Sequence, residues 1–282
     1  MVSWLLEPLA YAFMQRGLVV AVVVGIVCAV VGCYIVLRGM AFLGDALGHA
    51  ILPGLAVGYL ASGGDSTYLF WWALGAAIFS SISISVLSRG RIKQDTAIGI
   101  VFAGMFALGI ALISTMRSYA VDLSHFLFGN ILGVTTQDVW LTAAVGLTVL
   151  LIIVAFYKEF MVLSFDAQLA TTLRLPARPL EIVLSVLTAV AIVVSLQTVG
   201  VALVVAMLVT PAATAYLLTK KLRSMMILAA AIAAGSGVVG LYASYYFNVA
   251  SGAAIVLACT AVFIAVWLGQ QVRSSLRTLS AS

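Results

Sequence analysis

Long uncharged runs, separated by short polar clusters, set the pattern of this chain. A bilayer-spanning helix needs about 20 apolar residues, and five of the runs have that length. The last two runs are about twice as long, so each predicts two spans, with turns expected near Gly200 and Asn248. The pattern therefore predicts nine spans, or eight if the sixth run crosses only once. The runs are Gly17–Leu37, Met40–Ser62, Ser66–Ser88, Thr96–Met116, Val139–Tyr157, Ile182–Thr219 and Ser224–Val272.

Composition supports a membrane environment for the whole chain. Hydrophobic residues make up 64% of the 282 positions and charged residues 8%, whereas soluble domains carry about 25% charged residues. Alternating ten-residue segments typical of a membrane β-barrel are absent. Backbone at membrane depth must satisfy its own hydrogen bonds, so helices are expected. We predict an all-α polytopic bundle forming one transmembrane domain over residues 1–282.

Basic residues fall mainly in one set of loops. Twelve lie in alternate connections and two in the other set, which by the positive-inside rule predicts a cytoplasmic C-terminus. With nine spans, the N-terminus would lie outside. The net charge of +5 thus reflects topology and gives no reason to expect nucleic acid. The twelve are Arg38, Arg89, Arg91, Lys93, Lys158, Arg174, Arg178, Lys220, Lys221, Arg223, Arg273 and Arg277; the two are Arg16 and Arg117.

Asp45 is the one acidic residue placed well inside a predicted span. Ionisable groups at this depth are costly and usually face a cavity or pathway. His49 follows four residues later, so a helix places both side chains on one face. Carboxylate and imidazole groups are ligands for divalent transition metals. A structural Asp–His contact inside the bundle remains an alternative, because the pair supplies only two ligands.

Small residues surround this pair. Gly44 and Gly48 are four residues apart, and Gly54 and Gly58 repeat the spacing, which permits close helix packing. Pro53 is expected to kink the helix just after His49. Packing combined with a kink is compatible with a helix that lines a pathway.

A short helix is expected in the connection between the fifth and sixth runs, at about residues 164–176. Asp166 is a suitable N-cap and Pro176 a suitable stop. The helix could be a plain surface element or a docking site for a soluble partner, and the residues alone leave both open.

Other polar candidates are weaker. Asp122 and His125 fit a solvated outer loop better than an entry site for a ligand. Cys28, Cys33 and Cys259 all lie within apolar runs, so we expect small core residues rather than a disulfide or a thiolate site.

Several catalytic motifs are missing from the sequence. No lysine follows a glycine, so the phosphate-binding loop GxxxxGK[ST] is absent, as are HExxH and GxSxG. We expect that the chain is not an enzyme, that it holds no permanent cofactor, and that any ATP hydrolysis occurs in a separate subunit.

Three segments resemble the metal-ion permease family of ABC importers, whose members import manganese, zinc or iron. They are Val36–Gly54, Val199–Ala215 and Asn248–Ala253, with a further match to the coupling-helix pattern at Phe165–Asp166 and Ala170. The resemblance covers nearly the whole chain. It implies a type II permease fold, like that of the cobalamin importers, in a bacterial plasma membrane.

The resemblance also implies partners and roles. A second copy of the chain, two cytoplasmic ATPase subunits and an extracytoplasmic metal-binding protein would complete the transporter within the lipid bilayer. Asp45 and His49 would take part in passage of Mn²⁺, Zn²⁺ or Fe²⁺, with the site formed where two copies meet. The residues implied in ATPase coupling are Asp166, Ala170, Arg174 and Leu175.

Two positions depart from the family pattern. Position 48 is often Ser and is Gly here, and position 174 is often Gly and is Arg here. The second change puts the shape of the coupling contact in question. The sequence thus predicts an ABC importer permease for a divalent metal; the alternative is an autonomous secondary transporter or channel without an ATPase partner.

Overall fold

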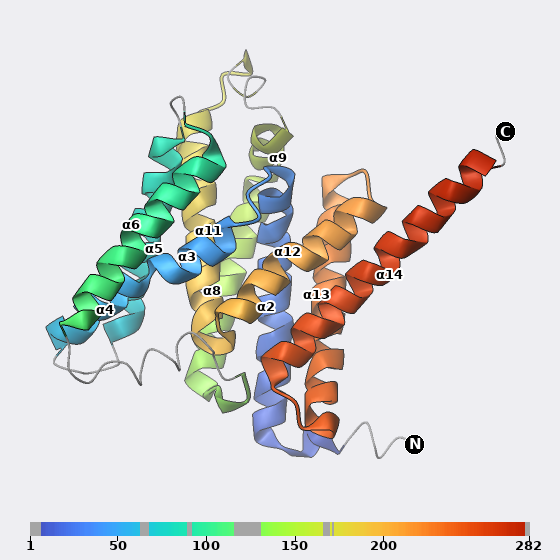
Figure 1. Cartoon of the computed structure of the whole chain (residues 1–282), viewed down its shortest axis with the longest axis horizontal. Helices are drawn as coiled ribbons and strands as arrows, with labels where there is room; N and C mark the ends of the chain where they lie inside the picture. The colour runs from blue at the N-terminus through green and yellow to red at the C-terminus, as the bar shows by residue number, and fades with distance from the viewer. Residues whose placement is uncertain are drawn as a thin grey trace.

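The regular secondary structure of the described residues is entirely helical (Figure 1). Membrane burial favours this outcome, because each helix satisfies its own backbone hydrogen bonds. The computed structural model describes residues 7–62, 68–88, 92–115, 131–165, 170 and 172–279, with side chains up to residue 273.

Nine helical segments in the described part of the chain are long and apolar enough to cross a membrane, as the sequence predicted. One of them, Leu43–Ser62, consists of the consecutive helices α3 and α4. Short helices η1 (Pro8–Ala10), η3 (Ile131–Gly133) and α9 (Tyr157–Phe165) lie near span ends. The spans are α2 (Ala12–Leu37), α3 (Leu43–Ala50) with α4 (Leu52–Ser62), α5 (Leu69–Leu87), α6 (Gln94–Ser114), α8 (Thr136–Ala155), α11 (Ala177–Val199), α12 (Val201–Leu218), α13 (Leu222–Phe247) and α14 (Ser251–Leu279).

The two long apolar runs break where expected. Gly200 separates α11 from α12 with a φ of 81°, a conformation that glycine adopts without steric cost. Asn248 ends α13 in the left-handed region with a φ of 52°, which asparagine tolerates better than most residues. Both double spans are therefore confirmed.

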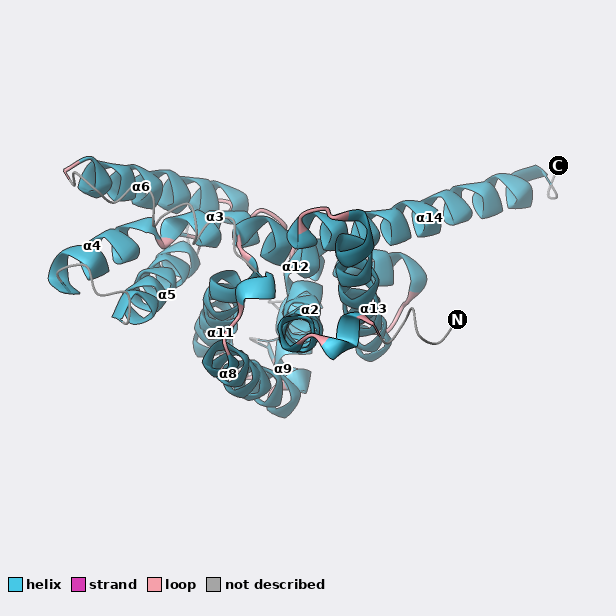
Figure 2. Cartoon of the chain, turned by 90° about the horizontal axis from the view of Figure 1, so that it is seen from below, coloured by secondary structure: helices cyan, strands magenta, loops and turns pink. Residues whose placement is uncertain are grey.

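Helix α2 is the central element of the bundle and packs against α8, α11, α12 and α13. Fourteen of its 26 residues are buried, and they lie on all sides of the helix, as expected for a core helix. In the view of Figure 2, α2 is seen nearly end-on, with these neighbours around it. The core of the fold thus forms around the first span.

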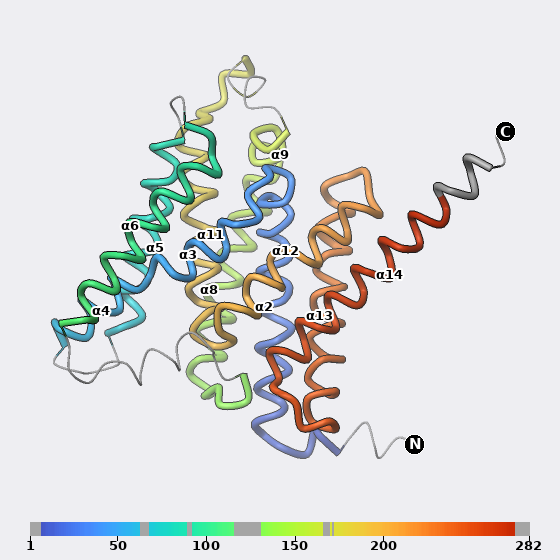
Figure 3. The backbone as a smooth tube through the Cα atoms, in the orientation of Figure 1, coloured from blue at the N-terminus to red at the C-terminus, as the bar shows by residue number. Residues whose placement is uncertain are grey.

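Helix α3 lies beside α6 and α12, on the side of the molecule along which α14 also runs (Figure 2). The tube in Figure 3 follows the chain from α2 through α3 into α4, which packs on α5 and α6. The short α3 is therefore held between the α4–α5–α6 group and the rest of the bundle.

Glycines allow several helices to approach closely. At Gly32 of α2, an added Cβ would lie 1.8 Å from the carbonyl oxygen of Leu208 in α12, so the two backbones are in direct contact. In α4, Gly54 packs against the backbone of Trp72 in α5, and Gly58 packs against the side chain of the same residue. The expected role of the second glycine pair in helix packing is confirmed.

All three cysteines lie in the described part of the chain, and all are buried and free. The thiol of Cys28 donates a hydrogen bond to the hydroxyl oxygen of Ser195, 3.4 Å away. The expectation that they are small core residues is confirmed.

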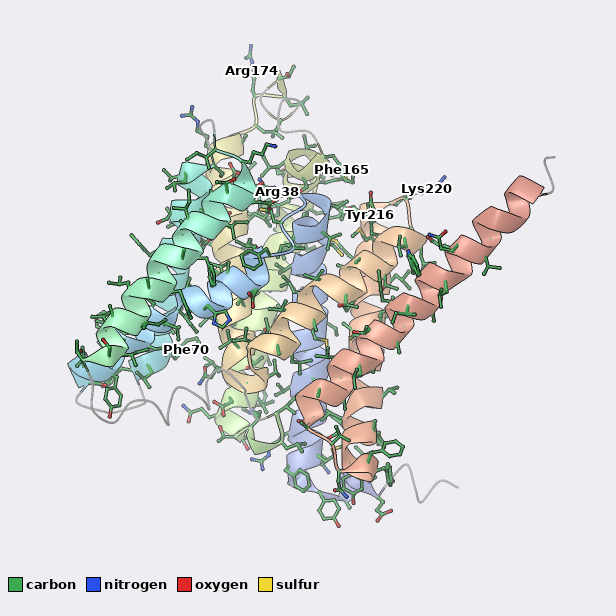
Figure 4. All side chains as sticks on the ribbon, viewed as in Figure 1. Arg38, Phe70, Phe165, Arg174, Tyr216 and Lys220 are labelled. Atoms are coloured by element: carbon green, nitrogen blue, oxygen red, sulfur yellow. The ribbon has the colours of Figure 1, made fainter. Side chains whose placement is uncertain are left out.

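Basic side chains gather at one end of the bundle. Figure 4 places Arg38, Arg174 and Lys220 toward the same end, while Phe70 lies toward the opposite one. We call the first the basic end; α2, α8 and α12 run toward it, and α11 and α13 start from it.

Candidate metal site and coupling segment

The turn before α3 fixes where the candidate site begins. Gly39 follows the last turn of α2 with a φ of 70°, and the N–H of Met40 donates to the carbonyl oxygen of Ile35 at 3.0 Å. This is the bond that closes a Schellman motif at a helix C-terminus. Because α2 ends so sharply, α3 starts at Leu43, only a few residues later.

The other end of α3 is set by Pro53. Helix α3 ends at Ala50 and α4 begins at Leu52, so the expected break after His49 is confirmed. Proline has no N–H to donate to the carbonyl of residue 49, which interrupts the hydrogen-bond ladder. Gly109 of α6 packs against this break, since a Cβ there would lie 2.6 Å from the Cβ of Leu52.

Asp45 and His49 form the open face of α3. The other six of its eight residues are buried, whereas the side chains of Asp45 and His49 are 39% and 28% exposed. The His49 Nε2 lies 3.7 Å from the Asp45 Oδ1. The predicted juxtaposition on one helix face is therefore present.

The spacing of these two atoms suits a shared ion better than a direct hydrogen bond. Hydrogen bonds between nitrogen and oxygen fall at about 2.7–3.2 Å, so 3.7 Å is too long for one. Two ligand atoms that are each about 2.1 Å from one metal lie about 3.4 Å apart at a tetrahedral angle. A small side-chain adjustment would let both atoms bind one ion.

Phenylalanine rings of α6 enclose the imidazole. The His49 ring centroid lies 6.1 Å from that of Phe102 and 5.7 Å from that of Phe106, both in edge-to-face geometry. The Nδ1 atom of His49 is buried, with no hydrogen-bond partner among the described residues. The ring is thus positioned by packing, and its Nε2 faces Asp45.

Glycines occupy the side of α3 that packs against α11 and α12. A side chain at position 48 would meet Val201 Cγ1 at 3.1 Å and Leu196 Cδ1 at 3.5 Å, and one at Gly44 would meet Leu208 Cδ2 at 3.1 Å. Position 48 therefore faces α11 and α12. A serine there would place its hydroxyl in this apolar contact, so the departure at Gly48 leaves the open face unchanged.

The described part of the chain contains no group of three or more His, Cys, Asp or Glu residues that could hold a metal. Asp45 and His49 could therefore supply two ligands, with no third candidate of these residue types beside them in the described part of the chain. Asp122 and His125, the other polar candidates, lie outside the described residues.

An ion pair near the site was missed by the sequence reasoning. The Arg38 Nη2 donates to Glu181 Oε1 of α11 at 2.8 Å, and the two side chains are only 10% and 21% exposed. Arg38 immediately follows α2, so the pair joins the turn before α3 to the early part of α11. The two residues are 143 positions apart in the sequence, and the positive-inside rule had assigned Arg38 a purely topological role.

The predicted coupling segment leads into α11. Asp166, its proposed N-cap, lies outside the described residues. The Leu175 N–H donates to the Ala170 carbonyl oxygen at 3.0 Å, and Arg174 has a φ of 56°. This bond and this left-handed residue are those of a Schellman motif, so a helical turn ends here before Pro176.

Arg174 therefore takes the conformation that glycine adopts more easily. The change from the family pattern leaves the turn in place at a cost of about 1–2 kcal/mol in backbone energy. Ala170 is fully buried, whereas Leu173 is 55% exposed and Arg174 is exposed. Leu173 and Arg174 thus offer exposed side chains to a partner, whereas Ala170 packs inside; the coupling role expected for Ala170 stays a prediction.

Comparisons with known proteins agree with the motifs. The model of the ABC 3 transport family matches residues 10–270. The manganese transport system membrane protein MntC of Listeria monocytogenes is 48% identical over 258 residues, which cover 92% of this chain and 91% of that protein.

Solved structures agree as well. A chain of PsaBC from Streptococcus pneumoniae, in complex with Fab, has a TM-score of 0.81 and 42% identity, with 95% of each chain covered. An inward-facing structure described as a metal-chelate type ABC transporter has a TM-score of 0.71 and covers 91% of this chain and 86% of that one. Its identity is 15%, so it supports the fold alone.

The family model covers far more than half of the chain, and the nine apolar helices account for its multi-pass character. The type II permease fold expected from the sequence is confirmed by the solved structures. The chain is therefore a multi-pass membrane protein that belongs to the ABC 3 transport family.

Proposed function

We propose that this chain is the membrane-spanning subunit of an ATP-driven importer of divalent transition metal, with Mn²⁺ as its first candidate cargo. The observation that carries the proposal is the open face of α3, where Asp45 and His49 stand partly exposed within a membrane span. The match to the ABC 3 transport family supports an ABC transporter, and the name of the similar protein MntC, a manganese transport system membrane protein, supports manganese. The family assignment does not support the alternative of an autonomous secondary transporter.

The exposure of Asp45 argues for a second copy of the chain. A carboxylate that is 39% exposed cannot face lipid at low cost. If two copies meet at the α3 side, two Asp45 and two His49 side chains supply four ligands. Four is the number that tetrahedral sites use, and water can extend it. Native mass spectrometry of the purified chain should show two copies, and transport by a single copy would contradict this arrangement.

The Asp45 carboxylate and the His49 imidazole would replace part of the hydration shell of the ion as it passes. Neutral imidazole and carboxylate suit Mn²⁺ as well as Zn²⁺ and Fe²⁺, so selectivity must depend on geometry and supply. The proposed direction is from an extracytoplasmic metal-binding protein toward the basic end, which the positive-inside rule places in the cytoplasm together with the C-terminus.

Two cytoplasmic ATPase subunits are proposed to dock on the segment at residues 164–176. Leu173 and Arg174 offer exposed side chains there, and the Schellman turn joins them directly to α11. The Arg38–Glu181 ion pair then joins α11 to the turn before α3. This chain of contacts is a direct physical route from the ATPase to Asp45.

The coupling proposal has a matched test. Leu173→Asp should abolish stimulation of the ATPase by the permease, because it places a charge in an apolar contact. Lys93→Asp, an exposed position at the same end with a larger change of charge, should leave the stimulation intact. Equal ATPase activities for both variants and the wild type would show that residues 164–176 form only a surface element.

The transport proposal is tested by reconstitution. Proteoliposomes containing the chain, its ATPase and the extracytoplasmic metal-binding protein should accumulate ⁵⁴Mn²⁺ only when ATP is present on the ATPase side. The chain alone should not accumulate the ion under a proton gradient. Gradient-driven uptake by the chain alone would overturn the proposal and favour an autonomous transporter.

A further inference from the structure

A cavity at the basic end lies outside the metal site and borders the proposed coupling segment only at Phe165. It has a volume of about 560 Å³ and lies between the ends of α2, α9 and α12 and the start of α13. Its lining includes Leu37, Phe165, Tyr216, Met225, Lys220 and Lys221. Figure 4 shows Phe165, Tyr216 and Lys220 at similar height near this end of the bundle.

The cavity combines an apolar interior with a basic rim. Leu37 and Met225 belong to the packed core or to residues in contact with it. Phe165 and Tyr216 are 62% and 55% exposed. Lys220 and Lys221 are exposed in the turn between α12 and α13. Among the described lining residues there is no acidic side chain, and neither lysine forms an ion pair within the described part of the chain.

The position of the cavity along the bundle indicates which part of the membrane it faces. The cavity lies where the spans α2 and α12 end and α13 begins, which is the level of the lipid headgroups. The first turn of α13 begins beside this region and has no side-chain cap, so its first amide groups lack that kind of acceptor. A volume of this size is in the range of ligand pockets, about 300–1,000 Å³.

We propose that this cavity binds an anionic phospholipid of the surrounding leaflet. The phosphate would lie against Lys220 and Lys221, and the upper part of one acyl chain would occupy the apolar wall below them. Basic pockets between membrane helices recognise anionic lipid headgroups in this way. Charge complementarity favours such a lipid over a zwitterionic one, and the apolar wall favours a lipid over free phosphate.

The binding site can be mapped with a photoactivatable lipid. Phosphatidylglycerol with a diazirine on its acyl chain is incorporated into nanodiscs that contain the purified full-length chain. Adducts are expected on the peptides that contain Phe165 and residues 216–225. Labelling should fall by roughly tenfold in the Lys220→Gln/Lys221→Gln variant, because two lysines beside an anionic headgroup are lost.

A matched variant separates a defined site from general attraction to the membrane. Lys158→Gln/Arg178→Gln removes two exposed charges from the same end but none from the cavity lining, and it should label like the wild type. Equal loss in both double variants would overturn the proposal. Unfolding temperatures of both variants in neutral detergent should match, so that loss of labelling reports binding and not folding.

Two further outcomes would also overturn the proposal. Full displacement of the lipid by an equal concentration of glycerol 3-phosphate would identify a free-phosphate site. Abolition of labelling on addition of the ATPase, combined with weaker ATPase binding by the lysine variant, would identify a protein contact. Persistence of labelling in the assembled transporter is the expected result.

Discussion

The contact between α2 and α12 gives the sharpest test of the packing. In Gly32→Ala, the new Cβ would lie 1.8 Å from the carbonyl oxygen of Leu208 and 2.8 Å from its carbonyl carbon. Real Cβ contacts essentially never fall below 3.0 Å, so the two helices must separate by at least 1.2 Å at this point. The obstacle is backbone, so no side-chain rotation can relieve it.

The expected cost follows from this displacement. Overpacking a well-packed core costs about 1–3 kcal/mol, and the rigid backbone contact places this substitution at the upper end. A loss of about 3 kcal/mol corresponds to a decrease of roughly 6–12 °C in the unfolding temperature for a chain of this size. Leu208 also lies beside Gly44 of α3. The displacement of α12 should therefore reach the part of α3 next to Asp45 and reduce transport too.

Thermal unfolding of the detergent-purified chain measures this effect. The matched control is Gly235→Ala in α13, where nothing lies within 4 Å of an added Cβ; it should be neutral or slightly stabilising, because alanine favours helix. Indistinguishable unfolding temperatures for Gly32→Ala and Gly235→Ala would refute the reasoning, since they would mean that α2 and α12 are not in backbone contact.

Two further predictions concern the basic end. Glu181→Gln should lower the free energy of unfolding by about 2–3 kcal/mol, because the Arg38 side chain, 10% exposed, loses the negative charge that balances its own; the double variant Arg38→Met/Glu181→Leu should unfold close to the wild type, and an equally large loss in the double variant would contradict this. Arg174→Gly should raise the unfolding free energy by about 1 kcal/mol, because glycine adopts a φ of 56° without strain; unchanged or lower stability on denaturant titration would argue against the turn.

Much of the architecture could be predicted from the sequence because lipid imposes a simple rule. Apolar runs of sufficient length must be helices, and the two overlong runs had to turn at Gly200 and Asn248. The four-residue spacing of Asp45 and His49 placed them on one face in the same way. The break at Pro53 follows from the missing N–H.

Contacts between distant segments could not be predicted. The pairing of Arg38 with Glu181 and the enclosure of His49 by Phe102 and Phe106 depend on how α2, α3, α6 and α11 pack, which no local pattern encodes. The tight approach of Gly32 to α12 likewise depends on helix crossing rather than on spacing along the chain. The full burial of Ala170 likewise depends on tertiary packing, and its role in ATPase coupling stays a prediction.

The central claim is that Asp45 and His49 line the path of the metal. Its most direct test is ATP-driven uptake of ⁵⁴Mn²⁺ by proteoliposomes that contain the ATPase, the extracytoplasmic metal-binding protein and one of three permeases: the wild-type chain, Asp45→Asn, or Asp95→Asn as an exposed carboxylate control. The three preparations are compared at equal incorporation and with matched unfolding temperatures. We expect uptake by Asp45→Asn to fall by roughly tenfold or more, as for the loss of a metal-site residue, and uptake by Asp95→Asn to match the wild type. Wild-type uptake by Asp45→Asn would show that the pair is structural and that the metal takes another route.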